Sequence, residues 1–489
     1  MERKSTDYAV DYLSSVLENC LEKFEADTKV KQATEAHIVS MFQRYMAGAG
    51  AEHVVLSANG DYMYMFDGKG FTYIDKNNLE YLVTLVLQRL EINNIYTVNS
   101  AKKIADKCAL FIRNDQALRF KPDRRWAVFD NCVFDLMEFK MVPHSPDYRS
   151  DLRFDYDYDP NAYSELWEQK LAETIPDRSM RDTFQEFCGS MLDCRGYKIE
   201  YACFLIGPVG QNGKSLIVNA IKGVFNQILV SSITLSNLFK AHNKEYYAAE
   251  ADGKIMNVVD DLDYKDFSGG EFKAFVSSES ITAREPCGKP FETWHLPKLI
   301  CNVNDMPPIS DDSGGLERRM MPISCPNIIT DEMRDESLPG KLAKVEVKQA
   351  IFNWLVEGYM RIVERGGKIT LSVTMQDMRA GIMENTNSAR RWLAEYGYEP
   401  YKGSDQDHWR SFNDLMREYT AYCKDFNYNP QGASSVGRLL SKKGFEKRHM
   451  RSCQMYNIGV ASQEQKYDAG TYPETPGYVG LQENEDLPF

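Results

Sequence analysis

The sequence has no apolar run long enough to cross a membrane. One helical crossing needs about 18 consecutive apolar residues, and no such run occurs in the 489 residues. The first residues, "MERKSTDYAVDYL", also lack the apolar block of a secretory signal. Both absences favour a cytoplasmic protein over a membrane or secreted one.

Regularly spaced cysteines are also missing. Eleven cysteines are scattered along the chain without a C-x-x-C pair, and the closest two are Cys188 and Cys194. A zinc ribbon and a disulfide framework both need regular spacing, so the sequence argues against both. The scatter is typical of a protein in a reducing compartment.

The chain has no excess of basic residues either. Its formal net charge is −13, so its overall field repels nucleic acid. Binding of nucleic acid would therefore need a local basic patch or a pore. The hydrophobic share of 43% and the charged share of 26% are ordinary for a globular protein, and the length indicates two to four domains.

Hydrophobic periodicity predicts the main elements. "YMYMFDGKGFTYID" and "AVFDNCVFDLMEFKMVPH" predict hairpins, and "SMRDTFQEFCGSML" predicts a helix. The apolar stripe of that helix consists of Met180, Phe184, Phe187, Cys188 and Met191. "KQAIFNWLVEGYMRIVERGG" predicts a further helix that ends at its paired glycines.

These patterns also predict the domain boundaries. The expected segments are a mostly helical N-terminal domain with a hairpin (1–119), a helical region before the core (120–199), an α/β core of short strands and polar loops (200–330), a helical linker (331–388), a smaller unit of helices and a hairpin (389–460) and a flexible acidic tail (461–489).

The core begins with "YACFLIGPVGQNGKSLIVNAIKGVF", which predicts a strand, a glycine-bearing loop and a helix. The loop ends in Gly213, Lys214 and Ser215. Backbone N–H groups and the start of the next helix hold phosphates in such loops. Lys214 would meet the β- and γ-phosphates, and Ser215 would ligate Mg²⁺. We therefore predict a site for ATP and Mg²⁺. A glycine-rich turn that binds nothing is the alternative.

The first half of this loop departs from the usual G-x-x-x-x-G-K-[ST] pattern. Pro208 stands where the first glycine is expected, between Gly207 and Gly210. We assign Gly207, Gly210 and Asn212 to the phosphate cradle together with the last three residues of the loop. A bulge at Val209 and Gly210 would use the permissive backbone of glycine.

A second strand supplies carboxylates. In "KIMNVVDDLD", apolar residues precede Asp260 and Asp261. In ATPases with this arrangement, one carboxylate holds Mg²⁺ through water and the other polarises the attacking water. We assign Asp260 to the metal side and Asp261 to both metal and base, with Asp263 as a weaker rival for the base. Aspartates that merely open a turn are the alternative.

A third strand, "LPKLICNVNDMPP", ends on Asn304. An amide there orients water beside the γ-phosphate, or it simply opens the turn before Pro307. Arg318 and Arg319 follow in "GGLERRMMPI". They are either solvated surface or groups that reach a neighbour's nucleotide and stabilise transition-state charge.

Taken in this order, the motifs resemble those of superfamily-3 helicases, and more closely the primase–helicase branch of poxviruses, phages and plasmids. The matching pieces are "NGKS", "FKAFVSSESITAREPCGKPFETW", "PKLICNVNDMP" and the arginine pair. The resemblance covers roughly residues 120–460, from "AVFDNCVFDLMEFKMVPHSP" through "GKLAKVEVKQAIFNWLVEGYMRI". It departs from the family at Cys132, where a glycine is usual.

The resemblance implies an α/β fold with an AAA+-like P-loop ATPase core that forms a homo-hexameric ring, with ATP between subunits. One arginine would then act on the neighbour's nucleotide. We place that role on Arg319, with Arg318 second.

The resemblance also implies a hairpin whose tip lines the pore, and "ITAREPCGKPFETW" fits it. Lys289 at that tip would grip single-stranded DNA. Six copies of one lysine would concentrate positive charge in the channel of an acidic protein. The alternatives are that Lys289 is an exposed turn residue, and that Arg284 makes a structural ion pair instead of a second DNA contact.

The segment "SSVGRLLSKKGFEKRHMR" is locally basic. A helix followed by a hairpin resembles the winged helix that this family often carries. Lys442, Lys443 and Arg448 would then bind duplex or forked DNA. A solvated basic face is the alternative.

As a whole, the resemblance implies an ATP-dependent helicase that translocates on single-stranded DNA during replication of a phage or mobile element, in the cytoplasm of a bacterial host. The residues before the similar region are too few for a polymerising primase. Two alternatives are an ATP-gated origin-binding or loading protein without unwinding activity, and a small-molecule phosphotransferase. The second is disfavoured because such kinases need no arginine in trans.

The last residues, "LQENEDLPF", suggest a separate contact. Bacterial single-strand-binding proteins end in a similar acidic run that closes with Asp-Ile-Pro-Phe. A terminal carboxylate and a phenylalanine ring fit an apolar pocket with a basic rim. We expect Asp486, Leu487, Pro488 and Phe489 to bind host replication proteins or the chain's own basic patch. A solvated tail is the alternative.

Overall fold

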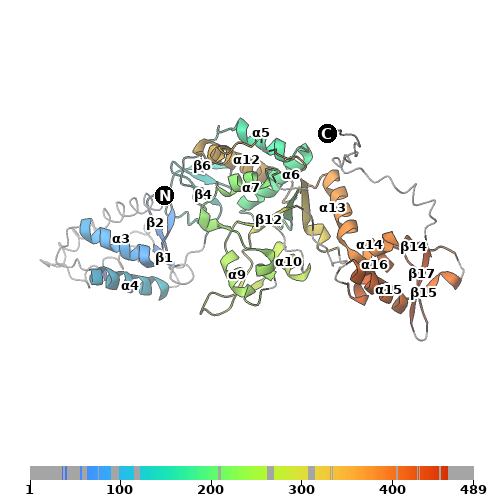
Figure 1. Ribbon diagram of the computed structural model, residues 1–489. Helices are drawn as coiled ribbons and strands as arrows, with labels where there is room; N and C mark the ends of the chain where they lie inside the picture. The colour runs from blue at the N-terminus through green and yellow to red at the C-terminus, as the bar shows by residue number, and fades with distance from the viewer. Residues whose placement is uncertain are drawn as a thin grey trace, which may run out of the picture. The chain divides into compact units, whose positions relative to one another are not determined.

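A computed structural model describes most of residues 122–460 and parts of the region before them (Figure 1). The described residues are 36, 39–40, 55–57, 63–74, 76–89, 98–114, 122–207, 211–239, 241–260, 269–304, 306, 314–330, 332, 334–403, 406–426, 428, 430–450 and 453–460. No helix in these ranges is long and apolar enough to cross a membrane. The tail predicted at 461–489 lies outside the described residues.

The chain forms two compact units. The first comprises residues 1–262, 274–305 and 319–376, and the second comprises residues 263–273, 306–318 and 377–489.

Within described residues 55–114, the first unit contains a three-stranded antiparallel sheet and two helices. These elements are β1 (Val55–Ser57), β2 (Met63–Phe66), β3 (Phe71–Ile74), α3 (Lys76–Arg89) and α4 (Val98–Asn114). The carboxylate of Asp67 stabilises the turn between β2 and β3, because it accepts hydrogen bonds from the backbone N–H groups of Lys69 and Gly70. The hairpin predicted for this stretch is confirmed.

A second three-stranded antiparallel sheet follows. Its strands are β4 (Trp126–Val128), β5 (Val133–Asp135) and β6 (Lys140–Val142). Ion pairs join the first hairpin to this region, between Asp67 and Arg153 and between Lys69 and Asp130. The structure therefore adds a third strand to the predicted hairpin, and the helices of region 120–199 begin only at residue 165.

Three helices pack in the same unit. They are α5 (Glu165–Thr174), α6 (Arg178–Gly189) and α12 (Val345–Glu364). The side chain of Asp177 caps α6 by accepting from the N–H of Met180, and the predicted apolar stripe of this helix is buried. The helix α12 ends before Gly366 and Gly367, which both have positive φ, as the sequence predicts.

The helices α6 and α12 lie unusually close because two glycines meet opposing backbone. A Cβ on Gly358 would lie 2.2 Å from the carbonyl oxygen of Gln185. A Cβ on Gly189 would lie 2.4 Å from the nitrogen of Tyr359. Neither position has room for a side chain, so this helix pair depends on both glycines.

A five-stranded parallel sheet forms the core of the first unit, in the order β13-β7-β12-β9-β8. Its strands are β7 (Ala202–Ile206), β8 (Val230–Ser231), β9 (Met256–Asp260), β12 (Lys298–Val303) and β13 (Met320–Ser324). Most residues of β7, β9, β12 and β13 are apolar and buried, as expected for parallel strands covered on both faces. This sheet confirms the α/β fold predicted for residues 200–330.

Helices and one hairpin connect these strands or follow them. They are α7 (Lys214–Lys222), α8 (Leu235–Phe239), α9 (Lys244–Ala251), α10 (Gly269–Val276), β10 (Ile281–Ala283), β11 (Phe291–Thr293), α11 (Leu338–Leu342) and α13 (Val373–Thr386). Figure 1 shows α6, α7 and α12 gathered beside the sheet that contains β12.

In the described residues 388–460, the second unit contains three α-helices and a four-stranded antiparallel sheet. They are α14 (Ser388–Glu395), β14 (Tyr398–Pro400), β15 (Trp409–Ser411), α15 (Phe412–Asp425), α16 (Ala433–Lys442), β16 (Lys447–His449) and β17 (Gln454–Val460). The other three strands all pair with β17. The pair β16–β17 confirms the hairpin predicted near residue 450.

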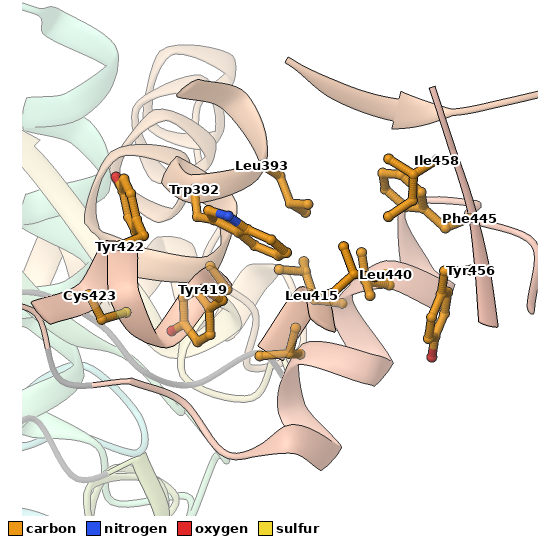
Figure 2. Close-up of a cluster of buried hydrophobic side chains, with 13 residues drawn as sticks. Trp392, Leu393, Leu415, Tyr419, Tyr422, Cys423, Leu440, Phe445, Tyr456 and Ile458 are labelled. Atoms are coloured by element: carbon orange, nitrogen blue, oxygen red, sulfur yellow. The ribbon is translucent and has the colours of Figure 1, made fainter. Parts of the chain in front are cut away.

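A buried cluster of apolar side chains holds this unit together. Its members are Ala389, Trp392, Leu393, Leu415, Tyr419, Tyr422, Cys423, Val436, Leu439, Leu440, Phe445, Tyr456 and Ile458. Figure 2 shows ten of them labelled, including Trp392 and Leu415, which come from different helices. The buried hydroxyl of Tyr419 contacts Ser388 and accepts from the N–H of Gln431. The unit therefore has a core of its own.

Gly358→Ala should lower the free energy of unfolding by about 1–3 kcal/mol, because the added methyl group forces α6 away from α12. Thermal and denaturant unfolding measure this loss. Gly340→Ala is the matched control, since a Cβ there meets nothing within 4 Å and alanine suits the helix α11. Wild-type stability of Gly358→Ala would contradict the close approach of the two helices.

Candidate nucleotide site

The carboxyl ends of β7, β12 and β9 lie at one edge of the parallel sheet. From β7 the chain crosses toward β8 on one side, and from β12 it crosses to β13 on the other side. The neighbouring strands β7 and β12 therefore have connections that leave in opposite directions. Open α/β sheets bind their ligands at such a switch point. In this chain the loop that begins at Gly207 follows β7 and lies at that switch point.

Lys214 is the first residue of α7 and is buried, with 7% of its surface exposed. Its ammonium group donates to the carbonyl oxygens of Gly207 at 3.2 Å and Val303 at 2.9 Å. It also donates to the side-chain oxygens of Asn212 and Asn304, both at 3.2 Å. The structure thus brings together four residues that the sequence analysis assigned to the site: Gly207, Asn212, Lys214 and Asn304.

All four oxygens that accept hydrogen bonds from Lys214 are uncharged. An ammonium group has three N–H donors, so the four acceptors share them. Burial lowers the pKa of Lys214, and the nearby thiol of Cys325 opposes this shift. Among the described residues, no carboxylate pairs with this ammonium group. A buried cation that has only dipoles as partners is stabilised by an incoming anion. The site is therefore electrostatically suited to phosphate.

Two glycines of the loop leave no space for a side chain. Gly213 precedes α7 with φ +81°, and a Cβ there would lie 2.6 Å from Oγ1 of Thr174. A Cβ on Gly207 would lie 2.6 Å from the carbonyl oxygen of Cys325 and 2.8 Å from Cγ of Asn212. The residues between them, 208–210, lie outside the described residues, and so does the predicted bulge at Gly210.

Asparagine side chains connect the Gly207–Gly213 loop to neighbouring segments of the chain. Asn212 donates to the carbonyl oxygen of Asn327 at 3.2 Å, and Asn327 donates to that of Glu173 at 2.7 Å, near the end of α5. The N–H of Ile329 donates to the carbonyl oxygen of Gln211. Sequence reasoning missed Asn327, because an asparagine in the segment after a strand carries no signal that separates it from an ordinary loop residue.

The acidic strand lies next to the asparagine-bearing strand. Asp260 is the exposed last residue of β9, and Asn304 directly follows β12. In β12, two positions before Asn304, Nδ2 of Asn302 donates a hydrogen bond to Oδ1 of Asp260 at 2.6 Å. Sequence reasoning missed Asn302, although a polar residue in so apolar a strand was a signal. Asp261 and Asp263 lie outside the described residues.

The residues assigned to Mg²⁺ that the structure describes are Ser215 and Asp260, and both are exposed. No cluster of three or more His, Cys, Asp or Glu side chains suited to a metal occurs in the described part of the chain. One hydroxyl and one carboxylate nevertheless fit Mg²⁺, which keeps several waters and is bound largely through substrate phosphates. The donor set therefore suits a nucleotide-borne ion.

The arginine pair lies in a short 3₁₀ helix, Glu317–Arg319, before β13. Arg319 is buried, donates to Oγ of Ser277 at 2.6 and 2.8 Å, and forms an ion pair with Glu200 at 3.3 Å. Arg318 is exposed. The structure therefore ties Arg319 to Ser277 and Glu200 of its own chain and leaves Arg318 at the surface.

The hairpin β10–β11 forms as the sequence predicts, with residues 284–290 between its strands. Lys289 is exposed there. Arg284 donates from Nε to the carbonyl oxygen of Gly288 at 3.1 Å, and its N–H donates to the carbonyl oxygen of Glu245. Arg284 thus stabilises the tip through hydrogen bonds to backbone carbonyls, and Lys289 lies at the surface of the same segment.

The assigned basic residues of the second unit are at its surface. Lys442 and Lys443 are exposed at the end of α16, and Arg448 is exposed in β16. Lys443 forms an ion pair with Glu384 at 2.8 Å. The guanidinium of Arg448 lies 4.5 Å from the ring centre of Trp409. Asp486, Leu487, Pro488 and Phe489 lie outside the described residues.

Two protein-family models match parts of the chain. Residues 40–176 match the model described as D5 N terminal like (D5_N), across the boundary predicted at residue 119. Residues 205–319 match a family of unknown function, DUF5906. The second match begins in β7 and ends at Arg319, so it contains the loop, the acidic strand and β12.

Three solved structures of the NrS-1 C-terminal region, all in apo form, are similar to the chain. Their TM-scores are 0.46, 0.45 and 0.45, with 13%, 12% and 13% sequence identity. The similar part covers 85%, 86% and 83% of this chain and 98%, 99% and 96% of those chains.

Gly207→Ala should weaken ATP binding by about tenfold or more, because the methyl group displaces Asn212 and with it an acceptor of Lys214. Titration with a fluorescent ATP analogue measures the dissociation constant. Gly381→Ala, where a Cβ meets nothing within 4 Å, is the control and should bind as the wild type does. Equal affinity for both variants would show that the Gly207 contact does not shape the nucleotide site.

Proposed function

We propose that the chain is an ATP-driven DNA helicase of phage or mobile-element replication that works as a ring of six subunits. The observation that carries this proposal is Lys214, a buried cation with only neutral partners at the switch point of a parallel sheet. Phosphate supplies the negative charge that this environment lacks. The match of residues 40–176 to a D5 N-terminal-like region supports a relation to phage primase–helicases.

Each residue of the site has a role in nucleotide binding. Lys214 exchanges carbonyl and amide oxygens for oxygens of the β- and γ-phosphates, while the N–H groups at the start of α7 bind the same phosphates. The conformations of Gly207 and Gly213 allow this close approach of the backbone. Ser215 and Asp260 would hold Mg²⁺, which neutralises charge that develops on the phosphates.

Hydrolysis needs a water molecule in line with the γ-phosphorus. The water oxygen bonds to phosphorus, the bond to the β,γ-bridging oxygen breaks, and ADP leaves with that electron pair. Asn304 orients the water from the end of β12, and a carboxylate accepts its proton. We keep Asp261 for this base. Arg318 is the better candidate for the arginine that acts on a neighbouring subunit, because it is exposed and Arg319 is not.

The hairpin β10–β11 provides the DNA contact of the ring. Lys289 is exposed between its strands, and the bonds made by Arg284 keep that segment in shape. Repetition around a ring would give an acidic chain one concentrated ring of positive charge. The exposed Lys442 and Arg448 of the second unit would bind duplex or forked DNA as a winged helix does.

Lys214→Ala should reduce ATP hydrolysis by about 100-fold or more, because this cation meets the phosphates in both ground and transition states. Phosphate release measures the rate, with and without single-stranded DNA and over a range of protein concentrations. Lys198→Ala, a change of an exposed lysine in the same unit, is the control. Wild type should be stimulated by DNA and should separate a forked duplex.

The outcomes of this experiment distinguish the alternatives. DNA-stimulated hydrolysis without strand separation would favour a loading protein over a helicase. A rate per subunit that depends neither on protein concentration nor on DNA would exclude the ring and favour a phosphotransferase. Full activity of Lys214→Ala would overturn the nucleotide site itself.

Lys289→Ala should leave the DNA-independent ATPase rate unchanged but remove most of its stimulation by single-stranded DNA. The dependence of DNA affinity on salt should become less steep, since fewer phosphate contacts release fewer counterions. Lys289→Arg keeps the charge and is the matched control. If Lys289→Ala retains wild-type DNA affinity and salt dependence, the hairpin is not the DNA contact.

A further inference from the structure

We infer that Asn302 is a positioning residue, which holds the Asp260 carboxylate in the orientation that ATP hydrolysis requires. This inference rests on the proposed function and adds a residue that none of the motifs assigns. Asn302 lies in β12, two positions before Asn304, and its side chain contacts β9.

The contact between Asn302 and Asp260 follows from strand register. The two residues are direct partners on neighbouring parallel strands. Nδ2 of Asn302 donates to Oδ1 of Asp260 at 2.6 Å. Asn302 has 7% of its surface exposed, whereas Asp260 is exposed at the end of its strand. A buried donor thus fixes one oxygen of an exposed carboxylate, and the other oxygen would be left to bind Mg²⁺ or one of its waters.

The amide oxygen of Asn302, Oδ1, supports the same role. It is buried and has no hydrogen-bond partner within the described part of the chain. An orphaned buried acceptor costs free energy, so folded proteins retain such atoms mainly where an ordered water or a ligand satisfies them. This acceptor lies at the sheet edge where Lys214 also meets Asn304. It can therefore accept a hydrogen bond from a water or ligand bound at this end of the sheet.

Packing alone gives no reason for an asparagine at this position. Its neighbours in β12, including Ile300, Cys301 and Val303, are apolar and buried. An apolar side chain there would avoid the cost of an unsatisfied amide oxygen. A residue that breaks the local pattern of a buried strand is expected where function requires it.

The test compares Asn302→Leu, alone and combined with Asp260→Ala, with the control Asn219→Ala, which changes an exposed asparagine of α7. Asn302→Leu keeps the shape but cannot donate. Its kcat should fall by about 10–100-fold, its requirement for Mg²⁺ should rise, and its affinity for ATP and its melting temperature should stay near those of wild type. A residue kept for packing would instead lower the melting temperature and leave kcat unchanged.

Asp260→Ala adds a readout that does not depend on folding. If Asn302 acts through the Asp260 carboxylate, then adding Asn302→Leu to Asp260→Ala should leave the residual kcat unchanged, because the group that Asn302 orients is already gone. A residue that acts only through packing would lower the kcat by the same factor in both backgrounds.

Wild-type kcat and Mg²⁺ dependence for Asn302→Leu, or an equal fall in kcat when Asn302→Leu is added to Asp260→Ala, would overturn the inference. In either case active wild type would leave the proposed function intact. If wild type itself hydrolyses no ATP, the proposed function fails and the role of Asn302 fails with it.

Discussion

The buried ammonium group of Lys214 is the interaction on which the candidate site depends. Its acceptors come from the ends of β7 and β12 and from the loop between β7 and α7. Because a buried cation with neutral partners is costly, these parts must be held in fixed places for the fold to tolerate it. An anion relieves the same cost, so ligand binding and the order of the sheet edge are coupled.

Close packing around the loop provides that fixed geometry. Gly207 and Gly213 have no room for a Cβ, and Asn212 is connected through Asn327 to Glu173. The helix α5 therefore contributes to the shape of the phosphate loop, although it precedes the sheet in the chain. The region before the sheet is thus part of the site's support. A change in α5 would be transmitted to Lys214 through three hydrogen bonds.

Local sequence patterns predicted much of this arrangement. Apolar runs followed by glycine, aspartate or asparagine identified β7, β9 and β12 and the residues at their carboxyl ends, because each pattern depends on neighbours in the chain. Turn residues likewise identified the hairpin at Asp67, whereas the hairpin that carries Lys289 was expected only from the family resemblance. Asn302 and Asn327 escaped prediction because their partners, Asp260 and Glu173, are distant in sequence. A lone asparagine has the same local signature whether or not it holds another residue in place.

The sequence by itself determined which strand ends carry chemically useful side chains, since hydrophobic periodicity and loop composition are local properties. Only the tertiary structure decided that β12 lies between β7 and β9, which brings Asn304 to Lys214 and Asn302 to Asp260. It also decided that Arg319 is directed to Ser277 and Glu200. Strand order and the direction of a side chain depend on contacts between residues far apart in the chain, and local patterns do not contain those contacts.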